Sequence, residues 1–321
     1  MTEQLNVQQM AEKLLAADNI LILCHKNPDG DTVGCGSALY YALLALEKHA
    51  AVLCADPIPG RYAFTNPRLF KGEFEPQIVV AVDVASVQLF GEGNGVPQYT
   101  RHVDLCIDHH AGNSGYAEFT LLDGSAAAAA ELLYEVICAM HVEITPHIAD
   151  CLYTGLSTDT GCFVYSNTTA RTHRIAAALM DCGIDVAPVN KALFRTKSRT
   201  RLAMEAWMAE WAEYYDHDRV VVMQIPLSLC LDYKATEADV EELSSLAALV
   251  EGTDCGVTLR ELKDGRVKIS LRTGPRVNAT EVCALLGGGG HAAAAGATLH
   301  GTLGEVKQAV LQAIDMVAGE D

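Results

Sequence analysis

Histidine and aspartate residues follow the first strongly apolar segment of the chain. The sequence ILILCHKNPDGDTVG ends an apolar run at Cys24 and then places His25, Asp29 and Asp31 close together. Open α/β sheets bind ligands at the carboxyl ends of their strands, and this spacing can serve two cations. Asp and Gly after a strand also form ordinary turns and helix caps, so this segment alone leaves both interpretations open.

Two later apolar runs end on the same residue types. IVVAVDVAS carries one carboxylate, Asp83, and VDLCIDHH ends in Asp108, His109 and His110. A buried carboxylate is costly unless it is paired or bound to a metal, although a salt bridge or a helix cap would also satisfy Asp83. One histidine could bind a metal while Asp108 orients a ring, but paired histidines are often incidental surface residues.

The coincidence of these segments carries more weight than any one of them. Three successive predicted strands end in oxygen or nitrogen ligands, and a parallel sheet would bring those ends to one edge. Asp159, in the sequence GLSTDTGCF, is a weak signal by itself but completes the set. Six groups suffice for two divalent ions that share a carboxylate: His25, Asp29, Asp31, Asp83, His109 and Asp159. Carboxylate and imidazole ligands without thiolate favour Mn²⁺, with Mg²⁺, Co²⁺ or Fe²⁺ as alternatives, over structural Zn²⁺.

The elements that must position these residues are those of an α/β fold. Short apolar runs alternate with helical patterns in the first half of the chain, which predicts a largely parallel sheet with helices packed on each side. Strands are expected within 19–24, 51–55, 77–86 and 102–110, and helices within 32–49, 125–140, 147–160 and 172–183.

Three segments are predicted along the chain: a metal-binding domain at 1–194, a helical connector at 195–216 and a smaller α/β domain at 217–321. In the connector, Trp207 and Trp211 stand one helical turn apart, and we expect both to pack into a core. In the last segment, Asp264–Gly265 predicts the tight turn of a β-hairpin.

A glycine run near the end of the chain is a candidate phosphate site. Backbone amides of Gly287, Gly288, Gly289 and Gly290 could cradle a phosphate, with His291 and Arg272 as charged donors. Glycine-rich segments also serve as flexible linkers or allow close packing, so the alternative stays open.

Composition limits the range of functions. The formal net charge of −18 opposes binding to long nucleic acid, and eleven cysteines without a CxxC pair indicate reduced thiols, mostly buried. With no long apolar run and no signal-peptide pattern, we expect a cytoplasmic protein that binds no membrane. The chain also lacks the G-x-G-x-x-G fingerprint, a P-loop and a G-x-S-x-G elbow, which disfavours dehydrogenase, NTPase and serine hydrolase activity.

Taken in order, these motifs resemble the DHH phosphoesterase superfamily, in the branch that carries a C-terminal DHHA1 domain. The resemblance spans nearly the whole chain and rests on the ordered pattern His25-x-x-Pro28-Asp29-x-Asp31, Asp83, Asp108-His109-His110, Asp159 and GGGGH. It implies a DHH domain followed by a DHHA1 domain, with the active site in the cleft between them.

The resemblance also implies a role for each residue. One metal would bind His25, Asp29 and Asp83, and the other would bind Asp31, Asp83, His109 and Asp159, so that Asp83 is the bridge. Asp108 would support the ligands and His110 would approach the phosphate, while Arg272 and the GGGGH segment would hold the far end of the substrate. Ala292 and Ala293 stand where family members often carry polar residues, which leaves the nucleotide preference open.

Length and layout are most similar to oligoribonucleases of this superfamily that also dephosphorylate 3'-phosphoadenosine 5'-phosphate (pAp). The resemblance therefore implies hydrolysis of very short RNA and of pAp by a protein that could form a homodimer. Two alternatives remain: a phosphodiesterase for cyclic or linear dinucleotides, and a non-catalytic nucleotide-binding module.

Overall fold

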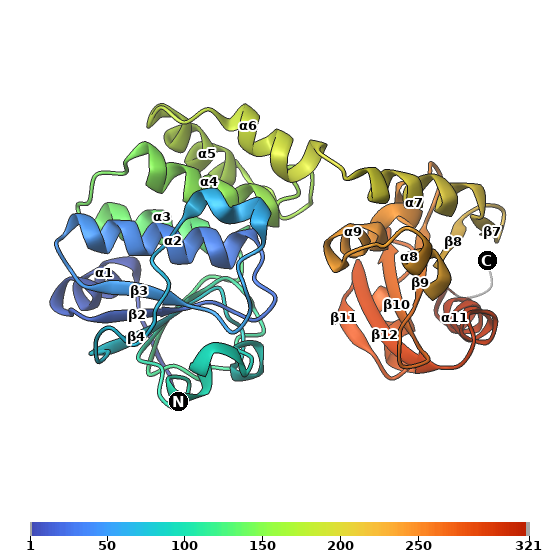
Figure 1. Cartoon of the computed structure of the whole chain (residues 1–321), viewed down its shortest axis with the longest axis horizontal. Coiled ribbons are helices and arrows are strands. Elements are labelled where there is room, and N and C mark those ends of the chain that lie inside the picture. Colours follow the sequence, from blue (N-terminus) through green and yellow to red (C-terminus); the bar gives the residue numbers. More distant parts are fainter. Residues whose placement is uncertain (1, 319–321) are drawn as a thin grey trace. The chain divides into compact units, whose positions relative to one another are not determined.

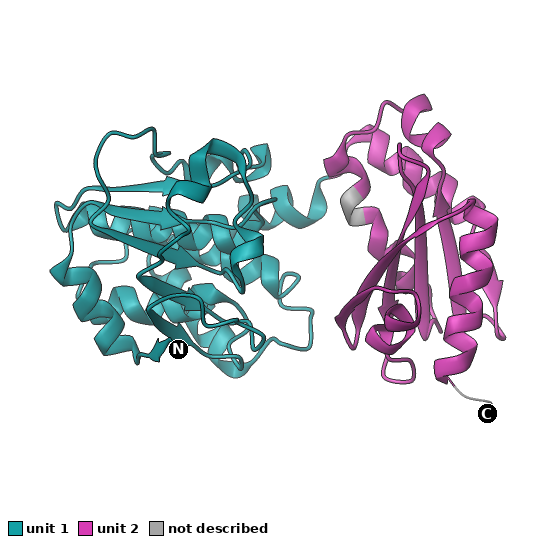
Figure 2. Cartoon of the chain, turned by 90° about the horizontal axis from the view of Figure 1, so that it is seen from below, with its two compact units in different colours: residues 1–196 teal, residues 197–321 magenta. Residues whose placement is uncertain are grey.

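A computed structural model describes residues 2–318, with the backbone alone at 241 and 242. The chain forms two compact units, residues 1–196 and residues 197–321 (Figure 2). The ends of the predicted domains at residue 1 and at 319–321 lie outside the described part of the chain.

Unit 1 contains the predicted parallel sheet. Its strands pair parallel in the order β1-β6-β5-β4-β2-β3. Their bounds are β1 (Glu3–Gln4), β2 (Ile20–Leu23), β3 (Ala50–Leu53), β4 (Ile78–Val82), β5 (Leu105–Asp108) and β6 (Phe119–Leu122). Because β2, β4 and β5 are direct neighbours, their carboxyl ends meet at one edge of the sheet.

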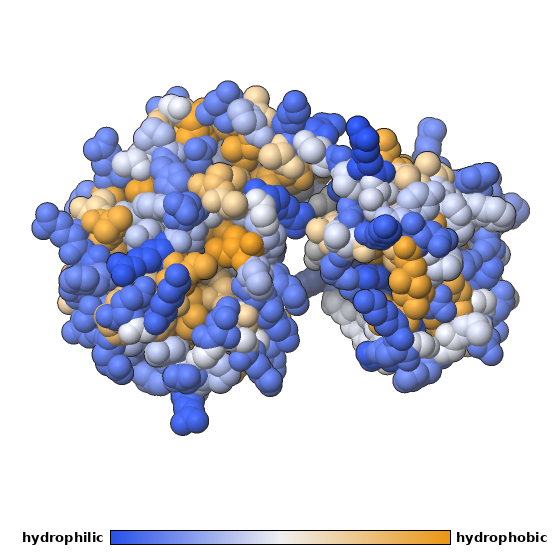
Figure 3. Space-filling view, in the orientation of Figure 1, coloured by the Kyte–Doolittle hydropathy of each residue, from blue (hydrophilic) through white to orange (hydrophobic). Residues whose placement is uncertain are grey.

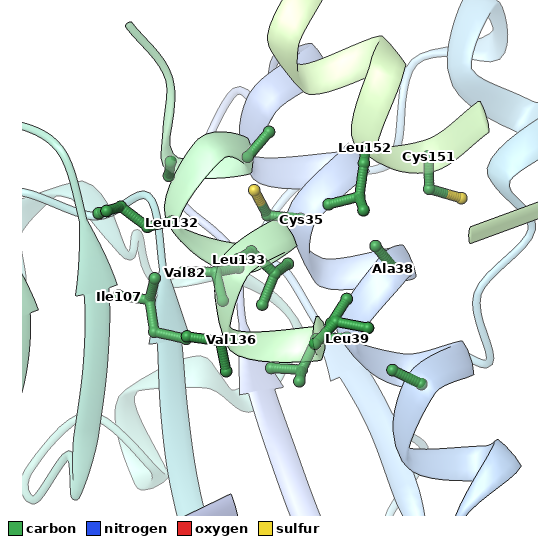
Figure 4. Packing of buried hydrophobic residues seen from close by; sticks show 14 of the residues in the cluster. Cys35, Ala38, Leu39, Val82, Ile107, Leu132, Leu133, Val136, Cys151 and Leu152 are labelled. Atoms are coloured by element: carbon green, nitrogen blue, oxygen red, sulfur yellow. The ribbon is translucent and has the colours of Figure 1, made fainter. Parts of the chain in front are cut away.

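The helices of unit 1 lie on one side of this sheet, with α4, α5 and α6 packed on the helices that contact it (Figure 1). They are α1 (Val7–Ala16), α2 (Gly30–Ala45), α3 (Ala129–Ala139), α4 (Pro146–Asp159), α5 (Ala170–Asp181) and α6 (Val186–Asn190), followed by a π-helical turn at Lys191–Arg195. Alternate strand residues such as Val82 and Ile107 pack under α2 and α3, where the alanine-rich helix α3 is buried as predicted (Figure 4). This alternation follows from the two-residue period of a strand.

Short turns, and not the expected helices, cover the opposite face. Phe90, Val96 and Val103 pack there against the remaining strand side chains. The 3₁₀ helices in these turns are η2 (Val87–Leu89) and η3 (Gly93–Gln98), whereas η1 (Gly60–Thr65), between β3 and β4, packs against α2 and α4. Pro97 and the glycines beside it interrupt the segment between β4 and β5, because proline cannot donate a helical hydrogen bond and glycine disfavours helix.

Glycine allows α2 and α4 to pack unusually closely. A Cβ at Gly34 would lie 2.4 Å from the Cys151 carbonyl oxygen, and one at Gly155 would lie 2.5 Å from Asp31 Oδ1. Such distances exclude any side chain at either position unless its neighbours shift. The close packing brings the beginning of α2 beside α4, whose last residue is Asp159.

Unit 2 contains a mixed sheet in the order β11-β12-β10-β9-β8-β7. Strands β8 and β9 pair parallel, and the other neighbours pair antiparallel. The strands are β7 (Glu213–Tyr215), β8 (Val220–Ile225), β9 (Cys255–Glu261), β10 (Arg266–Thr273), β11 (Gly289–His291) and β12 (Ala294–His300). The β9–β10 hairpin confirms the predicted turn, in which Gly265 has a φ of +79°.

Helices lie on both faces of the second sheet. They are α7 (Arg199–Glu210), α8 (Leu227–Asp232), α9 (Glu237–Glu241), η5 (Glu242–Leu249), α10 (Ala279–Leu285) and α11 (Leu303–Ala318). Val220 and Val222 pack toward α10 and α11, whereas Val221 and Met223 pack toward α7 and η5. The fold is therefore the predicted pair of α/β domains.

The segment 195–216, predicted as a connector, forms mainly α7 and β7, and Met204 and Met208 of α7 are buried in the core of unit 2. Trp207 packs against that core. Trp211 does not, because α7 ends at Glu210; its side chain is 61% exposed and stacks on Trp207 with 6.0 Å between ring centroids. The prediction that both tryptophans are core residues is wrong for Trp211.

The surface is mixed in character. Figure 3 shows apolar side chains gathered in small groups on a mainly hydrophilic face of each unit. No helix among the described residues is both long enough and apolar enough to cross a membrane.

The eleven cysteines are free thiols, seven of them buried, as predicted.

Candidate metal centre

The predicted ligands gather at the edge of the unit 1 sheet where β2, β4 and β5 end. Asp83 follows β4 directly and Asp108 is the last residue of β5. Asp29 is the N-cap of α2 and Asp31 lies in its first turn. The first loop, two strand ends and the end of α4 thus contribute to one site.

One part of the site surrounds His25. Its Nε2 atom lies 3.5 Å from Asp29 Oδ1 and 3.7 Å from Asp83 Oδ2. These three side chains offer ligand atoms that all lie within 4.8 Å of one another. Their spacing suits a single cation held by one imidazole and two carboxylates.

A second part surrounds His109. Its Nε2 atom lies 3.2 Å from Asp159 Oδ2 and 3.5 Å from Asp83 Oδ1. Asp31, His109 and Asp159 form another group within 4.8 Å. Asp83 therefore directs one carboxylate oxygen to each histidine, which is the geometry of a bridging ligand.

Backbone carbonyls fix the orientation of both imidazole rings. His25 Nδ1 lies 2.8 Å from the Lys26 carbonyl oxygen, and His109 Nδ1 lies 3.2 Å from that of Ala126. A ring that donates its Nδ1 hydrogen to a carbonyl keeps the Nε2 lone pair for a metal. Both Nε2 atoms face the carboxylates.

Two buried atoms at the centre fit a divalent cation. His109 Nε2 and Asp83 Oδ1 have no hydrogen-bond partner among the described residues, although polar atoms surround them. A buried polar atom left unsatisfied costs about 1–3 kcal/mol. A divalent cation between these atoms would satisfy both.

Electrostatic repulsion among the carboxylates supports the same fit. Burial, and then the charges of Asp31 and Asp29, raise the pKa of Asp83 well above its usual value. Burial and the nearby Asp159 raise the pKa of Asp31 to about 7. For His109 burial lowers the pKa, but the carboxylates of Asp159 and Asp31 outweigh it and raise the pKa to about 9. A cation that binds there would therefore displace protons from these side chains.

The backbone at Asp83 is strained. Its φ is +58°, a left-handed conformation that few residues other than glycine adopt, and its amide donates to the Ile107 carbonyl at 2.9 Å. Such strain typically costs about 1–3 kcal/mol and concentrates at functional sites. Here it points the carboxylate away from the strand and toward both histidines.

Capping and site roles coincide at the start of α2. Asp29 Oδ1 accepts hydrogen bonds from the amides of Asp31 and Thr32. The Asp31 carboxylate accepts from the amides of Ala129 and Ala130, at 2.6 and 3.1 Å, and so caps α3. The turn-and-cap interpretation and the ligand interpretation are thus compatible for both residues.

Asp108 lies behind the site and holds His110. Its Oδ1 atom lies 2.8 Å from His110 Nδ1, which leaves the partly exposed Nε2 of His110 for another partner. Asn113, which the sequence analysis did not single out, donates to Asp108 Oδ2 at 2.6 Å. Burial raises the pKa of Asp108, but the hydrogen bonds from His110 and Asn113 lower it overall. The position of Asn113 three residues after His110 was the signal available in the sequence.

The predicted substrate-binding residues lie in unit 2. Arg272 and His291 both pair with Ala294 of β12, so the register places them on one face of the sheet in a single row. Gly288 and Gly290 pack closely: a Cβ would lie 2.2 Å from the Gly296 oxygen and 2.6 Å from the Ala294 oxygen, respectively. Close packing therefore explains these two glycines, and their binding of phosphate stays a prediction.

Comparison with known proteins agrees with this geometry. Residues 19–156 match the model of the DHH family, N-terminal domain, and residues 217–320 match the DHHA1 domain. A Thermus thermophilus protein named bifunctional oligoribonuclease and PAP phosphatase NrnA is 33% identical over 95% of this chain and 92% of its own length.

Solved structures show the same fold. An exopolyphosphatase-related protein from Bacteroides fragilis superposes with a TM-score of 0.87 at 23% identity, over 97% of this chain and 96% of that one. Exonuclease RecJ bound to manganese superposes with a TM-score of 0.53 at 14% identity, over 97% and 93%. Both matched domains and the Thermus relative confirm the predicted family: this chain belongs to the DHH family of phosphoesterases, with a DHH domain followed by a DHHA1 domain.

Proposed function

We propose that this chain is a two-metal phosphoesterase that hydrolyses very short oligoribonucleotides to mononucleotides and removes a phosphate from pAp. The observation that carries the proposal is the pair of buried, unsatisfied atoms, His109 Nε2 and Asp83 Oδ1, set among crowded carboxylates. The substrate class is supported by the name of the Thermus thermophilus relative, which refers to oligoribonuclease and PAP phosphatase activities.

The proposed ligand sets follow the two groups around the histidines. His25, Asp29 and Asp83 would hold one cation, and Asp31, Asp83, His109 and Asp159 would hold the other. The alignment of Asp83 Oδ2 with His25 and of Asp83 Oδ1 with His109 supports a bridging role.

The donor atoms support Mn²⁺, with Mg²⁺, Co²⁺ or Fe²⁺ as alternatives. Oxygen and imidazole nitrogen atoms face the centre, a mixture that suits these ions. The nearby Cys35 thiol donates to Asp31 Oδ1 at 3.3 Å, and burial raises its pKa, so it stays protonated. Without a thiolate, the site differs from structural zinc sites.

The side chains around the centre have separate roles in the proposed hydrolysis: some bind the cations and others position His110. When bound, two divalent cations would supply the charge that activates water and neutralises the phosphoryl oxygens. His110 presents Nε2 to the phosphate, because Asp108 holds its Nδ1. Asp108 is in turn held by Asn113, so the ring orientation is fixed before substrate binds.

A small substrate is consistent with the charges of unit 2. Arg260 pairs with Glu237, Arg266 with Asp264 and Arg219 with Asp216, so these cations do not form a basic track for a long strand. Our candidates for binding the substrate there remain Arg272, Gly287, Gly288, Gly289, Gly290 and His291. The proposal includes a cytoplasmic location, which the eleven free thiols support, no membrane partner, and a homodimer as one state to be tested.

The test is a hydrolysis panel with and without Mn²⁺. It covers pAp, RNA dimers to pentamers, a long RNA, linear diadenylate and cyclic di-AMP, with folded Asp83→Ala protein as the control. We expect Mn²⁺-dependent turnover of pAp and the short RNAs, and none in the variant. Faster turnover of cyclic di-AMP than of pAp and RNA would favour the dinucleotide phosphodiesterase, and a wild type inert on every phosphoester would leave a non-catalytic binding module.

A further inference from the structure

The segment that follows Asp159 has an unusual backbone. Gly161, Cys162 and Phe163 have φ values of +55°, +58° and +66°, so three successive residues are left-handed. Left-handed residues normally occur singly, and each one other than glycine carries a strain of about 1–3 kcal/mol. The surrounding structure must therefore hold this turn firmly.

Side-chain contacts provide that support on both sides of the turn. The Phe163 ring stacks on His173, with 5.3 Å between centroids, and lies 5.9 Å from the Tyr153 ring. Asn167 Nδ2 donates to the carbonyl oxygens of Asp159 and Ala127, each at 3.0 Å. The segment is thus tied to Asp159, a candidate metal ligand, and to the loop before α3.

The rigid turn presents Tyr165 to solvent with one face supported. A Cβ at Gly161 would lie 2.4, 2.5 and 2.7 Å from the Cζ, Cε1 and Cε2 atoms of Tyr165, so Gly161 lies beneath the ring face. The ring is nevertheless 60% exposed, and the adjacent Val164 is 80% exposed. The opposite face of the ring is therefore open for stacking.

We propose that Tyr165 is a stacking platform for a nucleobase of the substrate whose phosphate binds at the metal centre. This inference rests on the proposed function and adds a base-binding residue to it. Every base offers an aromatic face, so stacking suits an enzyme acting on short RNA of any sequence.

Position distinguishes Tyr165 from an incidental surface aromatic. Its ring rests on Gly161, two residues from Asp159, and two residues span at most about 7 Å. One ribose separates the base and the phosphate of a nucleotide, a comparable reach. Single exposed apolar residues are common. Here, however, a strained backbone and a position where only glycine fits beneath the ring fix the Tyr165 side chain.

The test compares Tyr165→Ala with Tyr165→Phe in steady-state hydrolysis of pAp and of RNA dinucleotides with Mn²⁺. We expect the alanine variant to raise KM roughly 5- to 140-fold, the range of base–aromatic stacking, with kcat near wild type. The phenylalanine variant should restore KM. Tyr214→Ala, at a half-exposed tyrosine of unit 2, is the matched control and should behave as wild type.

A base-free substrate, ribose 3',5'-bisphosphate, separates stacking from a general structural effect. Its KM should be the same for wild type and Tyr165→Ala, and an equal rise for pAp and this analogue would overturn the inference. An unchanged KM for pAp would overturn it as well.

Binding of 2-aminopurine riboside 3',5'-bisphosphate, followed by its fluorescence, decides the inference even if the wild type shows no turnover. Weaker binding and lost quenching in Tyr165→Ala support stacking, whereas unchanged affinity refutes it. Failure of the proposed function would appear separately, as a wild type that binds the nucleotide but hydrolyses nothing.

Discussion

Asp83 and Asp108 are two buried aspartates at neighbouring strand ends that should respond oppositely to the same substitution. Asp83 Oδ1 has no hydrogen-bond partner among the described residues, and the pKa of Asp83 is raised. Asp108 accepts hydrogen bonds from the backbone amide of His109, from the His110 ring and from Asn113, and its pKa is lowered. Replacing Asp83 by asparagine removes a charge that destabilises the fold, whereas replacing Asp108 removes one that stabilises it.

In the metal-free protein we expect Asp83→Asn to be stabilising by about 1–3 kcal/mol, because it removes a carboxylate charge that burial and the neighbouring carboxylates disfavour. For a unit of this size that raises Tm by about 2–4 °C per kcal/mol. Asparagine also tolerates the φ of +58° at this position. Asp108→Asn should lower the free energy of unfolding by about 1–3 kcal/mol, because an amide nitrogen then faces N–H donors.

The changes in stability caused by the two substitutions should depend on pH in opposite directions. A raised pKa means that Asp83 ionises unfavourably in the folded state, so its burial costs stability as pH rises above its ordinary value. A lowered pKa means that Asp108 contributes stability above its ordinary pKa and loses it as pH falls through the lowered one. The difference in Tm between the variants should therefore widen from acid to neutral pH.

Calorimetry in EDTA and in Mn²⁺ measures both quantities. A cation at about 100 times its Kd adds about 2.7 kcal/mol to the wild type, and this gain should largely disappear in Asp83→Asn. Two results would refute the reasoning: a metal-free Asp83→Asn protein less stable than the wild type, or one that keeps the full Mn²⁺-dependent rise in Tm.

Three further predictions follow from the same geometry. Gly155→Ala should displace the Asp31 carboxylate, cost about 1–3 kcal/mol by overpacking and weaken Mn²⁺ binding; a wild-type Mn²⁺ isotherm would contradict this. Mn²⁺ binding at pH 7 should release protons, because the pKa of Asp31 is about 7 and that of His109 about 9, and the release should shrink above pH 9 when calorimetry is repeated in buffers of different ionisation enthalpy. Asn113→Ala should lower kcat about tenfold or more with KM little changed, because it removes the hydrogen bond that holds Asp108, and Asp108 orients the His110 ring. Equal kcat values for the variant and the wild type would count against a positioning role for Asn113.

The sequence by itself determined the fold class, the family and the group of residues at the strand ends. Apolar runs that end in His25, Asp83 and Asp108 are local patterns, and a parallel sheet brings such ends to one edge without further information. The hairpin at Asp264–Gly265 was predictable for the same reason, because a tight turn is specified by adjacent residues.

Tertiary structure decided what depends on contacts between distant segments. It placed the amides of α3 on Asp31 and the Ala126 carbonyl on His109, and neither of these pairs forms a sequence pattern. It also covered one face of the first sheet with short turns and left Trp211 exposed. Burial and orientation arise from the packing of the whole unit. Local spacing could therefore identify the candidate ligands but not the hydrogen-bond partners that orient their side chains.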